Sequence, residues 1–229
     1  MWQMVTIAQT ISDILSTLPQ GVRLVAVSKY HPASMIEEAY SAGQRIFGES
    51  HVQELRDKHA FLPQDIEWHF IGHLQTNKVK YIVPFVSLIH SVDSLRLLAE
   101  IDRQASRAGR VVDCLLQLHV AMEETKFGFM PDELLAFMES GEWREMRNAR
   151  ICGLMCMASN VDDKARIAGE FQQAQDIYLH LRERYFADAD YFRECSWGMS
   201  DDYPIAVRHG STIVRIGSRI FGERDIHAH

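Results

Sequence analysis

Residues 23–32, "RLVAVSKYHP", are the stretch that decides the fold. The apolar run from Leu24 to Val27 stops at Ser28 and Lys29, and Pro32 follows three residues later. A β-branched apolar run with such borders is typical of a buried strand, and a helix is expected to begin after the proline. A lysine at this place is either a solvated strand end or an amine at the mouth of a barrel.

Seven further runs of this kind follow along the chain, and segments with helical periodicity separate them. The eight strand-like segments are residues 23–29, 45–50, 67–72, 88–93, 111–120, 149–157, 191–197 and 212–218. The clearest helical segments are residues 94–109, 131–140 and 162–185. Eight strands alternating with helices in 229 residues favour an α/β fold, a single (β/α)8 TIM-type barrel. The alternative is an open doubly wound sheet, which usually needs fewer strands.

No linker rich in proline, glycine or serine interrupts the chain. We therefore expect residues 1–229 to form one barrel domain, with an amphipathic helix in residues 1–20 that packs on the barrel. The apolar residues on or near one face of that helix are Val5, Ile7, Ala8, Ile11, Ile14 and Leu15.

Composition excludes several classes of function. The formal charge is 24 − 31 = −7, and no basic run is longer than a pair, so nucleic acid is not an expected partner. No apolar run approaches the roughly 18 residues of a membrane span. The N-terminus lacks a basic region and carries Asp13, so it does not resemble a signal peptide.

The four cysteines predict neither disulfides nor a metal site. They lie in apolar, strand-like segments, where a free cysteine behaves as a small hydrophobic side chain. Cys152 and Cys156 are four residues apart, without a nearby histidine or a second cysteine pair to complete a zinc site. This usage is typical of the reducing cytoplasm.

In a barrel, functional residues are expected at the carboxyl ends of the strands. Lys29 ends the first strand, and a partly desolvated lysine there can form a Schiff base with a carbonyl. The loops after the last two strands carry Ser196 with Gly198 and Gly217 with Ser218, and such loops often bind phosphate. Periodicity does not decide whether Arg215 points inward or forms an outward ion pair. These residues predict a carbonyl ligand with a phosphate, which fits both a sugar-phosphate aldolase and a pyridoxal phosphate protein.

Several motifs carry a family resemblance. In order, they are "AVSK", "GQRIFGE" followed by "VQE", "WHFIGHLQTNK", "GLMCM" and "GMSDD", with "HGSTIVRIGSRIFGER" last, from about Arg23 to Arg224. Together they resemble the YggS/PROSC family of pyridoxal phosphate (PLP) homeostasis proteins, which have a barrel of the alanine racemase N-terminal type.

The resemblance implies PLP as the cofactor, with Lys29 as the Schiff-base lysine. It also implies Ser196, Gly198, Gly217 and Ser218 around the phosphate and Arg215 near the pyridine nitrogen. The family has no established catalytic activity, so we expect a carrier or regulator of PLP supply and no catalytic residue. An arginine keeps the pyridine nitrogen unprotonated and weakens PLP as an electron sink. Racemases of this fold also bring a base from a second domain, which is not expected here. The alternative is a racemase or decarboxylase of small amino acids.

The sequence departs from the family pattern in three places. Ser50 stands where the family has a cofactor-facing asparagine, and it has fewer donors, so water is expected to replace part of that contact. His51 stands where the family tends to have tyrosine. Trp197 is bulkier than expected and would narrow the phosphate loop.

The remaining candidates have weaker support. His73 is expected at the pocket rim, near the cofactor, and His69 in packed structure. Glu49 is expected to orient its neighbours, and Asp201 and Asp202 to turn away from the phosphate. Lys126 is a solvated loop lysine or a second amine that reacts with PLP. We expect a cytoplasmic monomer, with PLP-dependent apo-enzymes as partners.

Overall fold

The structure is a computed structural model that describes residues 6–122 and 127–223. Its centre is a closed barrel of parallel strands, in which β8 pairs with β1. The strands are β1 Arg23–Val27, β2 Ile46–Glu49, β3 Glu67–Phe70, β4 Leu88–Val92, β5 Val112–Gln117, β6 Ala149–Met155, β7 Glu194–Ser196 and β8 Ile213–Ile216. The predicted (β/α)8 barrel is confirmed, and the closure excludes an open doubly wound sheet.

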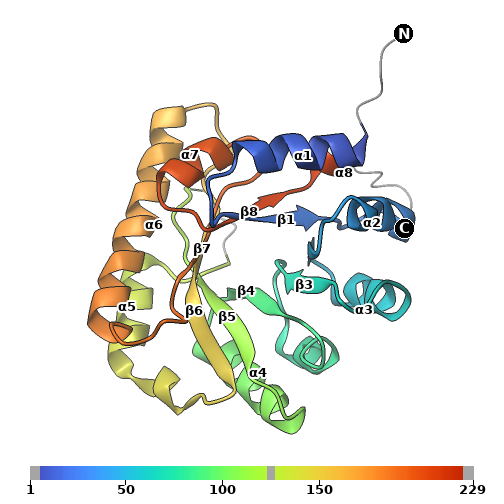
Figure 1. Ribbon diagram of the computed structural model, residues 1–229. Coiled ribbons are helices and arrows are strands. Elements are labelled where there is room, and N and C mark those ends of the chain that lie inside the picture. The colour runs from blue at the N-terminus through green and yellow to red at the C-terminus, as the bar shows by residue number, and fades with distance from the viewer. Residues whose placement is uncertain (1–5, 123–126, 224–229) are drawn as a thin grey trace.

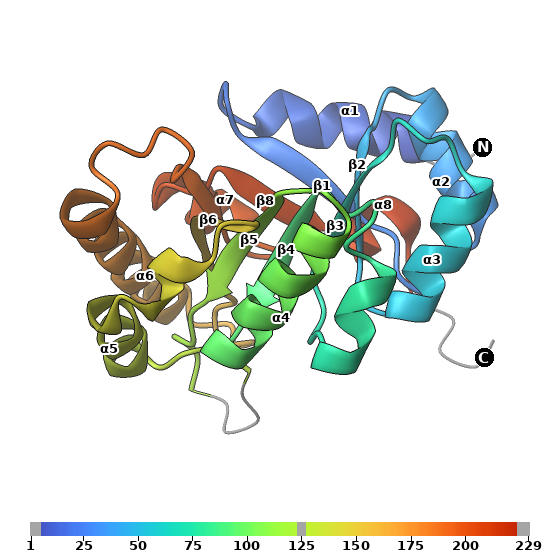
Figure 2. The same cartoon turned by 90° about the horizontal axis from the view of Figure 1, so that it is seen from below.

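Helices surround the strands, with α5 and α6 on one side of the barrel and α2 and α3 on the other (Figure 1). The α-helices are α1 Ile7–Thr17, α2 Ala33–Ser41, α3 Val52–Phe61, α4 Leu95–Arg107, α5 Pro131–Ser140, α6 Lys164–Tyr185, α7 Tyr203–Arg208 and α8 Ser218–Phe221. Two 3₁₀ helices, η1 Thr76–Tyr81 and η2 Glu142–Glu145, complete the described elements. Figure 2 shows α4 against the outside of β4 and β5.

Local sequence explains where the long helices begin and end. The hydroxyl of Ser94 accepts a hydrogen bond from the Leu97 N–H at 3.3 Å and caps α4. The carboxylate of Asp163 caps α6 in the same way. Gly141 ends α5 with a φ of 72°, a conformation that glycine adopts at little steric cost.

The N-terminal helix packs on the barrel through a narrower face than the sequence predicted. Ile7, Ile11 and Ile14 are buried. Ala8 is exposed, and 47% of Leu15 is exposed. Ala8 and Leu15 lie on the same side of α1 as predicted, but at the exposed edge of the face that packs on the barrel. Val5 lies outside the described residues.

Two apolar layers hold the fold together. The larger lies between the strands and the helices, where Leu24, Ala26 and Ile216 project outward from their strands. The smaller fills the barrel interior and consists of Val25, Leu88, Leu115, Cys152, Met155 and Ile213. Side chains alternate between these layers along each strand, and this alternation determines which polar residues face the barrel interior.

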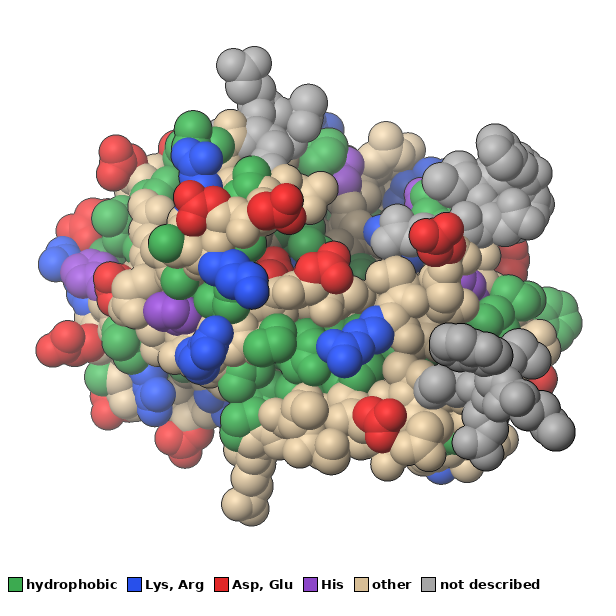
Figure 3. Space-filling view, turned by 90° about the horizontal axis from the view of Figure 1, so that it is seen from above, with side chains coloured by type: hydrophobic (Ala, Val, Ile, Leu, Met, Phe, Trp, Pro, Cys, Tyr) green, Lys and Arg blue, Asp and Glu red, His purple; other side chains and the backbone are tan. Residues whose placement is uncertain are grey.

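The surface mixes charges of both signs. The face seen in Figure 3 has acidic, basic and apolar side chains interspersed. Within the described residues, no helix combines the length and the apolar character that crossing a membrane requires.

Candidate functional site

Most of the predicted site residues lie at the carboxyl ends of neighbouring strands. Going round the barrel, Ser196 is on β7, Arg215 on β8, Lys29 after β1 and Ser50 after β2, with His73 following β3. These five strands are consecutive in the closed sheet. The structure therefore brings the predicted residues to one continuous arc of the barrel mouth.

Lys29 follows directly on the end of β1 and is half-buried. The strand pairing continues through Ser28, whose N–H donates to the Gly48 carbonyl at 3.0 Å. Immediately after Lys29, Tyr30 has a φ of 66°, the only positive value at a non-glycine residue within the described part of the chain. This conformation is costly for a tyrosine, so surrounding contacts must hold it.

Those contacts come from a buried cluster centred on Lys58 of α3. Its ammonium donates to Glu49 Oε1 and Glu54 Oε1, each at 2.7 Å, and to the Ser28 carbonyl at 2.8 Å. The other side of the cluster is the chain around Lys29. The Ser28 hydroxyl donates to Glu49 Oε1, and the Tyr30 N–H donates to Glu54 Oε1, each at 2.6 Å. We call Ser28, Tyr30, Glu49, Glu54 and Lys58 the Lys58 cluster.

Burial dominates the electrostatics of the Lys58 cluster. Glu49 is fully buried, and only 8% of Lys58 is exposed. Burial raises the pKa of the Glu49 carboxyl to about 7, and the neighbouring Lys58 acts in the opposite direction. The hydrogen bonds of the cluster hold Ser28 and Tyr30, the residues before and after Lys29, against α3. Glu49 orients its neighbours, as the sequence suggested.

Arg215 points into the barrel interior and is only 4% exposed. Its Nη1 donates to Ser196 Oγ at 2.6 Å and to the Ser196 carbonyl at 2.7 Å, and its Nη2 donates to the Cys156 carbonyl at 2.9 Å. One N–H on Nε and one on Nη2 have no partner among the described residues. The guanidinium is therefore clamped in place, with two donors left for another group.

The loops after β7 and β8 meet at the mouth. The hydroxyls of Ser218 and Ser200 are 3.2 Å apart, and the Arg215 N–H donates to the Gly198 carbonyl at 2.9 Å. Gly217 lies against the end of β1, since a Cβ there would stand 3.0 Å from the Val27 carbonyl oxygen. The β8 loop therefore approaches the strand that precedes Lys29, and the β7 loop contacts β8 and its loop.

The side chains of Asp202 and Trp197 in the β7 loop both form hydrogen bonds with backbone groups. Asp202 is buried and accepts a hydrogen bond from the Met199 N–H at 2.5 Å, so its carboxylate binds the loop's own backbone. Trp197 is fully buried in the outer layer, where its Nε1 donates to the His209 carbonyl at 3.2 Å. The expected narrowing of the loop by Trp197 was therefore wrong, because this side chain alternates away from the barrel interior.

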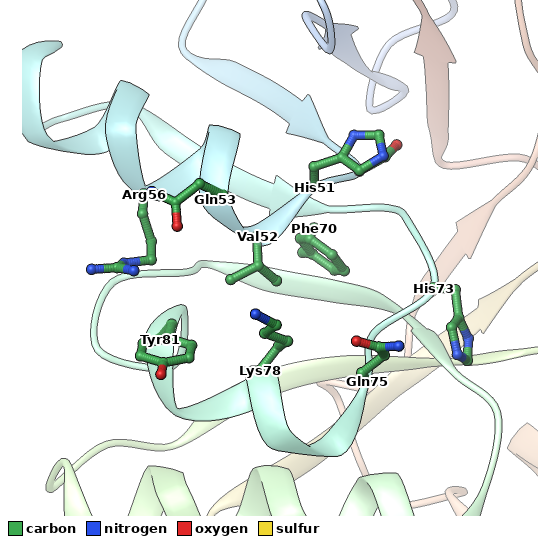
Figure 4. A pocket seen from close by; sticks show the side chains of 10 residues that line it. His51, Val52, Gln53, Arg56, Phe70, His73, Gln75, Lys78 and Tyr81 are labelled. Carbon is green, nitrogen blue, oxygen red and sulfur yellow. The ribbon is translucent and has the colours of Figure 1, made fainter. Parts of the chain in front are cut away.

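Ser50 and His73 lie beside an open pocket of about 430 Å³ between α3 and η1 (Figure 4). Gly72 holds them close together, since a Cβ there would clash with the Ser50 carbonyl oxygen at 2.3 Å. The His73 Nδ1 is 3.2 Å from Asp93 Oδ2, and its ring stacks on Phe127. His73 is thus at the rim of the mouth, fixed by its own partners.

The same pocket has a basic wall. Figure 4 shows the Lys78 ammonium directed into the pocket, with Arg56 on the opposite side above the ring of Tyr81. The Arg56 guanidinium carbon is 4.8 Å from the centre of that ring. In the described part of the chain, neither cation forms an ion pair.

Within the described residues, no group of three or more His, Cys, Asp or Glu side chains could hold a metal ion. All four cysteines are buried and free. Lys126, the suggested second amine, lies outside the described residues.

The family model for the alanine racemase N-terminal domain matches residues 4–225. The pyridoxal phosphate homeostasis protein of Aquifex aeolicus is 38% identical over 88% of this chain and 87% of its own length. The human protein of that name is 40% identical over 89% of this chain and 77% of its own length. This chain belongs to the family of pyridoxal phosphate homeostasis proteins.

Solved structures agree with this family and with the barrel type. PipY of Synechococcus elongatus, without PLP, is 39% identical, covers 95% of this chain over its full length and has a TM-score of 0.88. The PLP-bound structure of PipY is 38% identical, with the same coverage and a TM-score of 0.85. Alanine racemase from Bartonella henselae, at 14% identity, 97% coverage of this chain, 60% of its own and a TM-score of 0.71, shows the shared fold alone.

His51 and Ser50 are two of the three positions at which the sequence is expected to depart from the family pattern. The His51 ring packs against Tyr30 at 5.1 Å between ring centres, and its Nδ1 is 3.7 Å from Glu54 Oε2. His51 therefore joins the edge of the Lys58 cluster. Ser50 lines the basic pocket, and its role toward a cofactor remains a prediction.

Sequence reasoning missed Lys58, which donates to the carbonyl of Ser28 beside Lys29, and His90, which contacts the predicted site residue Ser196. The only sequence signal for Lys58 is its spacing of four residues from Glu54 on a helix, a pattern that is usually a solvated pair. His90 is fully buried in β4, and its Nδ1 is 2.9 Å from Ser196 Oγ. No local pattern could reveal that contact, because 106 residues separate the two partners.

Proposed function

We propose that this protein binds PLP through a Schiff base on Lys29 and acts in PLP homeostasis, as a carrier or regulator of the cofactor. The names of its relatives and the PLP-bound structure of PipY support this function. The main structural support is the position of Arg215. It is hydrogen-bonded inside the barrel on the strand next to the one that precedes Lys29, and two of its N–H groups have no partner among the described residues.

The described residues fit the cofactor. The half-buried Lys29 amine would hold its aldehyde, and the loops at Gly198, Gly217 and Ser218 would hold its phosphate. When bound, PLP supplies an electrophilic carbonyl and an electron-withdrawing ring. Arg215 would donate to the pyridine nitrogen. The resemblance implied Ser196 near the phosphate, but its hydroxyl is fully buried and hydrogen-bonded to Arg215, so we propose that Ser196 supports that arginine instead.

The same arginine favours a carrier over an enzyme. An arginine stays protonated in proteins and can only donate, so a ring nitrogen facing Arg215 must accept a hydrogen bond and remain unprotonated. An unprotonated ring withdraws electrons less strongly, which disfavours chemistry at the α-carbon of an amino acid. We therefore propose that no catalytic activity accompanies PLP binding.

We also propose that the chain is a single-domain cytoplasmic monomer and that PLP-dependent apo-enzymes receive the cofactor. Nucleic acid is not a proposed partner, because the charge is −7 and no long basic run occurs.

Borohydride reduction of the purified protein tests the site. The protein, alone or after PLP is added, should show the absorbance of a lysine-bound aldehyde, and reduction should fix the label on Lys29. The Lys29→Ala variant should lose the label, whereas Lys164→Ala, at the start of α6, should keep it. A protein that takes up no PLP, or a label on another lysine, would contradict the proposal.

Turnover separates the carrier from the alternative racemase or decarboxylase. The loaded protein should exchange the α-proton of alanine with deuterated solvent no faster than free PLP does. Exchange well above that rate, abolished in Lys29→Ala, would favour the enzyme.

A further inference from the structure

A chain of polar side chains runs through the barrel interior, a region that apolar residues usually fill. Arg215 Nη1 is 2.6 Å from Ser196 Oγ, and Ser196 Oγ is 2.9 Å from His90 Nδ1. His90 Nε2 is in turn 3.0 Å from His69 Nδ1. We call these four side chains the barrel relay. All are inward-facing and at most 4% exposed.

The barrel relay reaches from the mouth to the opposite end of the barrel. Arg215 belongs to the candidate cofactor site, whereas His69 lines a pocket of about 240 Å³ at the amino ends of the strands. That pocket also contains Arg23, Glu67 and Glu194, from the starts of β1, β3 and β7. The four relay residues come from four different strands, so the relay is assembled only by the folded barrel.

Hydrogen-bond chemistry determines the direction of the barrel relay. A guanidinium only donates, so Ser196 Oγ must accept from Arg215. Among the described residues, the one remaining partner for the hydroxyl proton of Ser196 is His90 Nδ1. Because buried polar groups are satisfied in folded proteins, His90 Nδ1 is the acceptor and His90 Nε2 carries the proton. His90 Nε2 then donates to His69 Nδ1, which leaves the proton of His69 on its Nε2.

Both histidines must be neutral for this arrangement. A protonated imidazole has no acceptor nitrogen, so a charged His90 could not receive the Ser196 hydroxyl. Burial lowers the pKa of His69 to about 3 and lowers the pKa of His90 as well. With both histidines neutral, the hydrogen bonds of the relay fix the orientation of the Ser196 hydroxyl and move no charge.

We propose that His90 and His69 are positioning residues for the cofactor, which act through Ser196 to hold Arg215 in place. His90 accepts a hydrogen bond from the Ser196 hydroxyl and so turns the serine lone pairs toward Arg215, and His69 fixes the tautomer of His90. This inference rests on the proposed function, since Arg215 has a ligand to position only if PLP binds at the barrel mouth.

The tautomers test the relay directly, without any variant or cofactor. Protein labelled with ¹⁵N in its histidine rings should show Nδ1 of both His69 and His90 as the unprotonated nitrogen. A proton on Nδ1 of either residue would reverse the chain and overturn the proposed direction. This measurement stays decisive even if the wild-type protein takes up no PLP, an outcome that would contradict only the proposed function.

Variants test the positioning role. His90→Leu removes the acceptor for Ser196 and should weaken PLP binding about ten-fold, with a shifted absorption of the bound cofactor. His90→Asn places an amide oxygen near the position of Nδ1, so it should restore most of the affinity and the wild-type spectrum. His59→Leu, which alters a histidine stacked on Phe85 outside the barrel, is the matched control and should change neither.

If His90→Leu binds PLP with the wild-type affinity and spectrum, His90 does not position the site, although the proposed function stands. A merely structural role would lower the stability of His90→Leu and leave the absorption of the bound cofactor unchanged. If His90→Leu does not fold, the comparison of His90→Asn with wild type and the tautomer measurement still decide the matter.

Discussion

Arg215 connects the proposed function to a single measurable contact. Replacing it by alanine removes the N–H groups proposed to face the cofactor ring. A charge-assisted hydrogen bond contributes roughly 1 to 3 kcal/mol, so Arg215→Ala should loosen PLP by about one to two powers of ten. Lys29 and the two loops would still hold the cofactor. Titration of the purified variant with PLP measures the change.

The variant should also remain inactive toward amino acids. Racemisation would need a base on the opposite face of the cofactor as well as a stronger electron sink. Unchanged affinity in Arg215→Ala would place the arginine outside the site, and efficient racemisation would reveal an unrecognised base.

Lys58 offers a second test at the scale of one residue. Lys58→Met leaves the fully buried Glu49 carboxylate without its ammonium partner. Breaking a buried ion pair in this way costs about 3 to 5 kcal/mol, which should appear as a lower free energy of unfolding in urea. The double variant Lys58→Met, Glu49→Gln should recover part of the loss, because the fully buried carboxylate of Glu49 is then replaced by a neutral amide. Lys80→Met, at an exposed position, is the control. A single variant as stable as wild type would show that the cluster contributes little.

These residues show which parts of the site could be read from the sequence. Lys29, Gly198, Gly217 and Ser218 follow apolar runs, and that local pattern is enough to place them at strand ends. The orientation of Arg215 could not be deduced, since β8 has only four residues and too few alternations to assign its faces. Contacts such as His90 with Ser196 exist only after closure of the sheet.

The loop between β7 and α7 depends on glycine at one position. Gly198 has a φ of 95°, and a Cβ there would stand 2.6 Å from the Ala206 Cβ and 2.9 Å from the Tyr203 Cα. Gly198→Ala should therefore shift this loop, lower stability by at least about 1 kcal/mol and weaken PLP binding. Thermal unfolding and PLP titration measure the two effects.

Gly169 in α6 is the matched control for that substitution. It lies in the helix, and nothing would contact an added Cβ within 4 Å. Gly169→Ala should raise the stability by about 0.5 to 1 kcal/mol and leave PLP binding unchanged. Equal behaviour of the two alanine variants would remove the special role assigned to Gly198.

Elements with local signals were predictable, and those without such signals were not. The expected α5 has the observed bounds, Pro131–Ser140. A proline at its first position and a glycine directly after its last residue mark both ends in the local sequence. The strand-like run at residues 111–120 was longer than β5, Val112–Gln117, because apolar residues continue into the loop. The 3₁₀ helix η1 was not predicted, because six residues are too few to show a helical periodicity in the sequence.

At the scale of the molecule, the barrel combines two apolar layers with the polar side chains of the barrel relay in its interior. Closure of the sheet places Lys29 between the Arg215 strand and the Ser50 strand, which is why residues nearly 190 positions apart share one mouth. The eight alternating apolar runs favoured this closure over an open sheet, and the family resemblance implied it as well. The contacts among the polar side chains inside the barrel could not be predicted, because they join residues from distant parts of the chain.

Buried neutral histidines should make the stability of the whole molecule depend on pH. The pKa of His69 is lowered from 6.5 to about 3 in the folded protein, so the unfolded chain binds a proton more readily between these values. A lowered pKa contributes stability above the unfolded value of 6.5, and this stability is lost as the pH falls toward 3. Glu49 has the opposite sign, because its raised pKa of about 7 makes its contribution decline as the pH rises through that value.

A variant separates the two contributions. Between pH 7 and pH 5, the wild-type protein should lose about 2 kcal/mol of unfolding free energy through His69 alone. His69→Asn keeps an acceptor near Nδ1 but cannot take up a proton, so it lacks this loss. Urea titrations at pH 7, 6 and 5 should therefore show the stability difference between wild type and His69→Asn moving by about 2 kcal/mol in favour of the variant. The Glu49 contribution is common to both proteins and cancels in the difference. A difference that stays constant across this range would mean that His69 is not held neutral by burial, and the barrel relay would then lack the uncharged acceptor on which its direction depends.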